Sequence, residues 1–196
     1  LVTNLGGYGQ FEYDYLVAAE WAAEVTAGRG AEGQSFDNGH GGTYKVYSTV
    51  AAAVTQAAID FASTTPAVVF VCGGTYAESV VVGLNQYVKL VGSGRDSTVI
   101  GGKTGVSVGP AIDATATGSR LWISSLTIES NDSTSGTASA GLKTTNGIIM
   151  FVHDCHIIGA LGPSGAAQYG IDGDPFGSPA VIQNCNISGA YGINMG

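Results

Sequence analysis

Two stretches of the chain, VHDCHIIGA at residues 152–160 and VIQNCNISGA at residues 181–190, share one pattern of apolar residues. A third copy, LWISSLTIES, occupies residues 121–130, so equivalent positions recur roughly every 30 residues. Units of that period stack into solenoids, because each unit buries its apolar side against the next one. The repeat therefore predicts a solenoid before any chemistry is considered, and the strands within each copy make it an all-β one.

Each copy predicts two short strands joined by a corner. Its last two apolar residues flank a single residue, and this period of two indicates a strand with one buried side. The residues before them, Ser-Ser, His-Asp and Gln-Asn, favour a bend. Stacked coils would place like residues over like, about 4.8 Å apart. The expected interior stack is Ile123, Leu126, Ile128, Val152, Cys155, Ile157, Ile182, Cys185 and Ile187.

Composition favours strands and tight turns over helices. The 196 residues include 31 glycines, and only 11% are charged. The three cysteines, Cys72, Cys155 and Cys185, are odd in number and lack a C-x-x-C spacing, which argues against a disulfide scaffold or a zinc site. We interpret them as buried free thiols. A Cys155–Cys185 disulfide stays open, because stacked residues lie close together.

The charge balance excludes several kinds of partner. The net charge is −8, whereas contacts to nucleic-acid phosphates need clustered Lys and Arg. No apolar run reaches transmembrane length, so membrane insertion is not expected. No motif indicates a cofactor or a metal. His153 falls at a corner and His156 on a strand, so the two are not expected to share a face.

The first third of the chain reads differently. Residues 12–28 are rich in Ala and place Val17, Trp21 and Val25 four apart, which predicts a helix with one apolar stripe. A Gly-rich linker follows at residues 28–43, and a second helix is expected at 48–63 with Ser48 or Thr49 as its cap. We therefore divide the chain into an N-terminal segment, 1–47, and a solenoid, 48–196.

Residues 49–102 carry a family resemblance. They combine the second helix, a buried strand AVVFV, the turn GGTYAES, a strand VVV and the phrase VKLVGSGRDSTVIGG. This order resembles the opening of right-handed parallel β-helix proteins of the pectin-lyase type, which include pectinesterases, pectate lyases and phage tailspikes. The resemblance implies a single-stranded right-handed parallel β-helix, with helix 48–63 as its cap and coils over 65–196. YGINMG at 191–196 repeats YGIDGD at 169–174, so we expect the coils to continue beyond residue 196.

The enzyme motifs of those families do not occur here. The Gln and two Asp with an LGRPW-like loop of pectinesterases are missing, and so are the calcium-binding carboxylates and RxPxxR-like run of pectate lyases. The remaining candidates for catalysis are Asp172 and Asp174, with Asp154 one coil away. Paired carboxylates can cleave a glycosidic bond. The alternative is that Gly-Asp-Pro marks a solvated turn.

Two functions compete. We favour a structural virion protein, such as a phage tail spike, tail fibre or capsid decoration, because AAEWAAE resembles phrases near the start of tail-fibre proteins. It would sit on the virion as a homotrimer and attach to other virion proteins through Tyr15, Val17, Trp21 and Val25. A host surface polysaccharide would then be its external partner, and catalysis by this segment is not expected. The alternative is a secreted or cell-surface carbohydrate-active enzyme, a polysaccharide lyase, hydrolase or esterase, and a bacterial adhesin is a further option.

Overall fold

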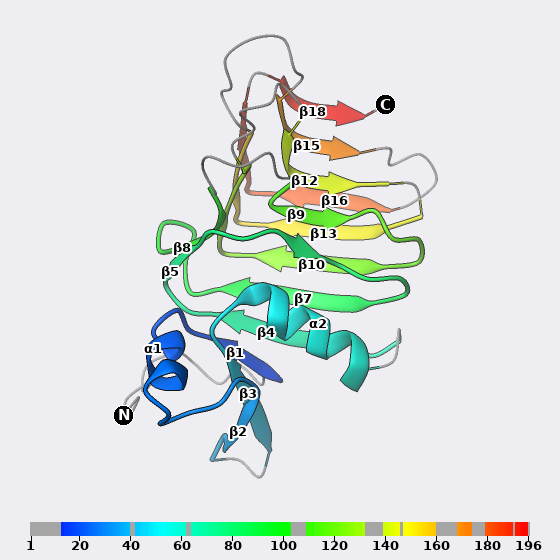
Figure 1. Ribbon diagram of the computed structural model, residues 1–196. Helices are drawn as coiled ribbons and strands as arrows, with labels where there is room; N and C mark the ends of the chain where they lie inside the picture. The colour runs from blue at the N-terminus through cyan, green and yellow to red at the C-terminus, as the bar shows by residue number, and fades with distance from the viewer. Residues whose placement is uncertain are drawn as a thin grey trace.

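The computed structural model describes residues 13–39, 42–61, 64–102, 109–131, 139–145, 147–159, 168–173, 179–189 and 191–195. These residues form a right-handed parallel β-helix, as expected (Figure 1). Three sheets run along the stack. Sheet A has the order β16-β13-β10-β7-β4-β1-β3-β2, sheet B the order β17-β14-β11-β8-β5, and sheet C the order β18-β15-β12-β9-β6.

The strands are short; from β4 onward each coil contributes one strand to each sheet, whereas β1, β2 and β3 belong to sheet A alone. Sheet A consists of β1 Tyr15–Val17, β2 Gln34–Asp37, β3 Thr43–Tyr47, β4 Ala67–Val71, β7 Tyr87–Gly92, β10 Arg120–Ser124, β13 Ile149–His153 and β16 Ala180–Gln183. Sheet B consists of β5 Gly74–Tyr76, β8 Thr98–Gly101, β11 Thr127–Glu129, β14 His156–Ile158 and β17 Asn186–Ser188. Sheet C consists of β6 Val80–Val81, β9 Ile112–Ala114, β12 Ser139–Thr144, β15 Gln168–Gly173 and β18 Tyr191–Met195.

The register of the sequence repeat is confirmed. Ile123 pairs with Val152 and Val152 with Ile182 in sheet A. Ile128 pairs with Ile157 and Ile157 with Ile187 in sheet B. The first two layers of the predicted stack are fully buried, and Ile182, Cys185 and Ile187 in the third layer are partly buried against the same core.

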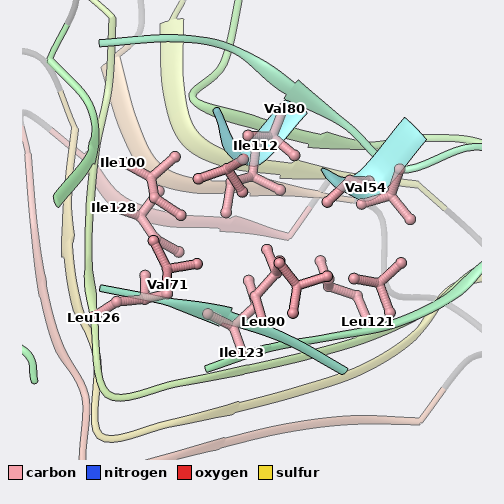
Figure 2. Packing of buried hydrophobic residues seen from close by; sticks show 14 of the residues in the cluster. Val54, Val71, Val80, Leu90, Ile100, Ile112, Leu121, Ile123, Leu126 and Ile128 are labelled. Atoms are coloured by element: carbon pink, nitrogen blue, oxygen red, sulfur yellow. The ribbon is translucent and has the colours of Figure 1, made fainter. Parts of the chain in front are cut away.

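The interior is a continuous column of apolar side chains, to which all three sheets contribute. Figure 2 shows Leu90 and Ile123 from sheet A, Ile100 and Ile128 from sheet B, and Ile112 from sheet C pointing toward a shared centre. Because like residues recur in register, each side chain packs against its counterparts in the neighbouring coils. The fold thus follows from the spacing of aliphatic residues and not from any single contact.

The corners between sheets A and B that follow β10, β13 and β16 each contain one residue in the left-handed backbone conformation. Ser125, Asp154 and Asn184 have φ of 56°, 52° and 53°, and each follows a strand of sheet A. Asp and Asn adopt this conformation more readily than other non-glycine residues. The two-residue bend predicted from Ser-Ser, His-Asp and Gln-Asn is therefore confirmed.

The helix expected over residues 12–28 forms only over residues 21–26, and the expected bounds are wrong. Tyr15–Val17 form β1, which pairs in parallel with β3 and β4, and only Trp21–Thr26 form a helix, α1. Tyr15 and Val17 are buried in the interior core, Trp21 is buried in a second cluster on the outer side of sheet A, and Val25 packs against that cluster. The apolar stripe that motivated attachment and trimer formation is thus covered within one chain, and both ideas remain predictions without that support.

The second helix caps the interior as expected. Helix α2, Val50–Asp60, begins after Thr49, whose side chain accepts a hydrogen bond from the Ala52 N–H at 3.2 Å. Val50 and Val54 project into the core. Sheet A continues past α2 through β1, β3 and β2, so strands of the N-terminal segment, 1–47, extend the sheet of the β-helix. In the described residues, neither helix is long and apolar enough to cross a membrane.

Candidate functional site

A row of polar side chains lies on sheet C at positions that alternate with the buried ones. Asp113 in β9 pairs with Lys143 in β12, Lys143 pairs with Asp172 in β15, and Asp172 pairs with Asn194 in β18. In the first three of these strands, Asp113, Lys143 and Asp172 each directly follow a buried core residue, namely Ile112, Leu142 and Ile171. Since side chains of a strand alternate between its two sides, the row faces outward.

Hydrogen bonds fix the two carboxylates. Asp113 Oδ1 accepts the Thr115 hydroxyl at 2.7 Å and the Thr115 backbone N–H at 3.0 Å. Asp172 Oδ1 accepts the side-chain N–H of Asn194 at 2.8 Å. Both carboxylates are half-buried, whereas Lys143 between them is exposed. The row therefore presents two oriented acceptors and one exposed cation to solvent.

The spacing of the carboxylates limits their chemistry. Asp113 and Asp172 lie two strands apart, which separates their Cα atoms by about 10 Å. Inverting glycosidases hold their two carboxyl groups about 6.5–9.5 Å apart so that a water fits, whereas retaining enzymes need about 5 Å. A Cα separation of about 10 Å is closer to the inverting range than to the retaining one, so the row is better suited to acid–base attack by water than to a covalent intermediate.

The other carboxylates named from the sequence do not join this row. Asp154 lies at the corner between sheets A and B, where its carboxylate is 3.7 Å from the Arg95 guanidinium. Asp172 lies in β15 of sheet C, so the structure places Asp154 and Asp172 on different parts of the coil. Asp174 lies outside the described residues.

His153, His156 and the three cysteines form no reactive cluster among the residues that the structure describes. His153 ends β13 in sheet A and His156 begins β14 in sheet B, so they belong to different sheets, as expected. Cys72 and Cys155 are buried, Cys185 is partly buried, and all three are free thiols. Burial raises the pKa of Cys155 to about 12, which keeps it a thiol at neutral pH. Across the part of the chain that the structure describes, no three His, Cys, Asp or Glu side chains are grouped to hold a metal ion.

Asp113 and Lys143 were missed by the sequence reasoning. A signal was present: AGLKT at 140–144 matches YGIDG at 169–173 and YGINM at 191–195, with Lys143, Asp172 and Asn194 at one position. Extending the alignment from two copies to three would have placed Lys143 beside Asp172. Asp113, in AIDA, follows from the same register.

Comparisons with known proteins agree with this architecture. Residues 47–116, which include Asp113, match the family model for "Rhamnogalacturonase A/epimerase, pectate lyase-like". No curated protein matches the chain. Two solved structures resemble it: a pectin methylesterase mutant in complex with a hexasaccharide, with a TM-score of 0.52, and a pectin methylesterase in complex with another hexasaccharide, with a TM-score of 0.53.

These likenesses concern the fold. Both structures are 18% identical to this chain and cover 89% of it, while the chain spans 55% of their length. A tertiary fold by itself does not fix an activity. The chain is a parallel β-helix protein with the pectin-lyase-like fold. This follows from its three parallel sheets, from the left-handed backbone conformation at three corners between sheets A and B, and from the matched segment.

Proposed function

We propose that the chain is the β-helix part of a carbohydrate-active enzyme that hydrolyses an acidic polysaccharide along the outer side of sheet C. The observation that carries the proposal is the row Asp113, Lys143 and Asp172, three outward side chains in register on successive coils. The matched family model and the two similar structures are of carbohydrate-active proteins, which supports this class.

The row offers a role for each group. One carboxylate takes a proton from water as the water attacks the anomeric carbon, and the other carboxyl group gives a proton to the leaving glycosidic oxygen. Lys143 lies between them and is exposed, so its ammonium can pair with a carboxylate of the sugar chain. A ligand with its own negative charges would otherwise be repelled by Asp113 and Asp172.

The experiment compares purified wild-type protein with Asp113→Asn, Asp172→Asn and Lys143→Gln. Polygalacturonate, its methyl ester, alginate and neutral glucan are incubated with each protein, and new reducing ends are counted. We expect hydrolysis of an acidic polymer by the wild type and a fall of at least about 100-fold in either Asp variant, in the range of acid–base contributions. Lys143→Gln should mainly raise KM.

Asp96→Asn is the matched control, because Asp96 is an exposed carboxylate in the turn between β7 and β8. It should retain wild-type activity. Equal rates in Asp172→Asn, Asp96→Asn and wild type would show that the row does not act in catalysis. An unsaturated product that absorbs ultraviolet light would indicate elimination and overturn the hydrolysis.

The virion appendage is the second candidate, and it stays a prediction, as do the trimer, the virion partners and the location on a particle. A surface that binds polysaccharide would serve a tailspike equally well. We favour the enzyme because the matched proteins are carbohydrate-active and because the row supplies two oriented carboxylates.

A further inference from the structure

A second set of outward side chains lies on sheet A, separate from the row on sheet C. We call it the Trp122 face: Tyr87 and Lys89 in β7, Arg120 and Trp122 in β10, and Phe151 in β13. Trp122 pairs with Lys89 on one side and with Phe151 on the other, and Arg120 pairs with Tyr87. The proposed hydrolysis makes no use of these residues.

Aromatic rings hold the two cations of this face in place. The Lys89 ammonium lies 5.1 Å from the centre of the Trp122 ring, and the Arg120 guanidinium lies 5.7 Å from the centre of the Tyr87 ring. The Trp122 and Phe151 rings are 4.3 Å apart and tilted by 40°. Cation–π contact restrains a charged group but leaves its N–H donors free for an anion. The face thus presents ordered cations beside apolar surface.

The charge of the Trp122 face is opposite to that of the whole chain. The chain has 15 acidic and 7 basic residues. Among the described residues that point outward from β7, β10, β13 and β16, none is Asp or Glu. These positions are Tyr87, Lys89, Val91, Arg120, Trp122, Ser124, Ile149, Phe151, His153, Val181 and Gln183.

The same side of sheet A is covered nearer the N-terminus. There, Trp21 of α1 packs with Leu16 and Phe70, and Phe36 of β2 contacts the Trp21 ring at 5.7 Å. Farther along the stack the apolar surface stays open, since Trp122 is 37%, Val181 41% and Ile149 43% exposed. Exposed apolar groups rimmed by polar ones mark binding surfaces.

We propose that the Trp122 face is a second carbohydrate-binding surface, which holds an acidic polysaccharide without cleaving it. Lys89 and Arg120 pair with carboxylates of the polymer, and Arg120 can do so with two parallel hydrogen bonds. The rings and aliphatic side chains cover the C–H surface of the sugars. Because this face lacks a carboxylate pair, it offers no acid and base for hydrolysis. A second copy of the chain is a weaker occupant, since two copies of net charge −8 repel each other.

Tryptophan fluorescence tests the proposal on the whole protein. In a Trp21→Phe background, Trp122 is the remaining tryptophan. A galacturonate hexamer and maltohexaose, a neutral hexamer, are titrated at low and high salt. We expect the fluorescence of Trp122 to change with the acidic hexamer, and the affinity to fall at least 10-fold in Lys89→Gln/Arg120→Gln and at high salt. Lys143→Gln, a cation on sheet C, should leave this signal unchanged.

Each other outcome rejects the proposal. Equal affinity for maltohexaose would show that the face does not select an acidic ligand. Unchanged affinity in Lys89→Gln/Arg120→Gln would show that the two cations do not bind the ligand. Loss of the Trp122 signal in Lys143→Gln would assign the ligand to sheet C alone. Light scattering that finds a dimer in the wild type and a monomer in the double variant would assign the face to self-association. Because hydrolysis is measured separately through Asp172→Asn, either proposal can fail while the other stands.

Discussion

The carboxylate of Glu78 accepts hydrogen bonds from the backbone N–H groups of Val50, at 2.8 Å, and Ala51, at 2.9 Å. Glu78 lies between β5 and β6, whereas Val50 and Ala51 open α2, so this contact joins the cap helix to the first full coil. The first N–H groups of a helix lack partners within the helix. Glu78 supplies two of those partners from 28 residues farther along the chain. Figure 1 shows α2 lying across β4 and β7 near this end of the stack.

Substitution of Glu78 should change how stability depends on pH. Burial raises the pKa of Glu78 above its ordinary value, and the two N–H donors lower it by less. The folded state thus binds the proton more tightly than the unfolded state. The stability from this group is complete below the ordinary pKa, near pH 4.3, and is lost as pH rises through the raised pKa.

We therefore expect wild-type stability to fall more steeply than that of Glu78→Gln as the pH rises from about 4 to 7. Urea denaturation at several pH values measures the difference. Glu20→Gln, at an exposed position in the same half of the chain, is the control and should follow the wild type. Parallel curves for wild type and Glu78→Gln would contradict the expected shift.

Ile→Ala substitutions in the core stack should lower the free energy of unfolding by different amounts along its length. Ile128 is fully buried between Ile100 and Ile157, whereas Ile187 in the last described layer is only partly buried. Removing three carbons from a fully buried Ile costs about 2–5 kcal/mol. We expect Ile128→Ala to fall in this range and Ile187→Ala to cost less than half as much, as measured by urea denaturation. Equal losses would mean that residue 187 is packed as tightly as residue 128.

The core stack could be predicted from the sequence because the same apolar pattern recurs three times in one register. The structure of the N-terminal segment could not be predicted in this way. Residues 15–17, Tyr-Leu-Val, precede an Ala-rich run that favours a helix, yet they form β1 because β3 and β4 offer pairing on both sides. Those partners lie about 30 and 54 residues away, so local pattern could not reveal them. Of the proposed site, Asp172 was named from the sequence, but Lys143 and Asp113 required the register between coils.

Asp60 should stabilise the N-terminal end of the stack above its own pKa. Its Oδ2 accepts the Lys45 ammonium at 2.6 Å and the Tyr15 hydroxyl at 2.8 Å, and these donors lower the pKa of Asp60. The contribution is present above the ordinary pKa, near pH 3.9, and is lost as pH falls through the lowered pKa. We expect Asp60→Asn to be less stable than wild type at pH 7, and the difference to shrink at lower pH. Asp37→Asn, on the exposed β2, is the matched control.

Gly101 should tolerate no side chain. It ends β8 with φ of 99°, a conformation open to glycine, and a Cβ there would overlap the backbone carbonyl oxygen of Glu129 in the next coil. The backbone strain alone costs about 1–3 kcal/mol, and the overlap forces the two strands of sheet B apart. We expect Gly101→Ala to lower the free energy of unfolding by at least about 3 kcal/mol or to prevent folding.

Gly109→Ala is the control, because a Cβ at Gly109 meets no atom of the described residues within 4 Å. It should stay within about 0.5 kcal/mol of wild type in urea denaturation, and similar stability of the two variants would contradict the close approach of the coils at Gly101.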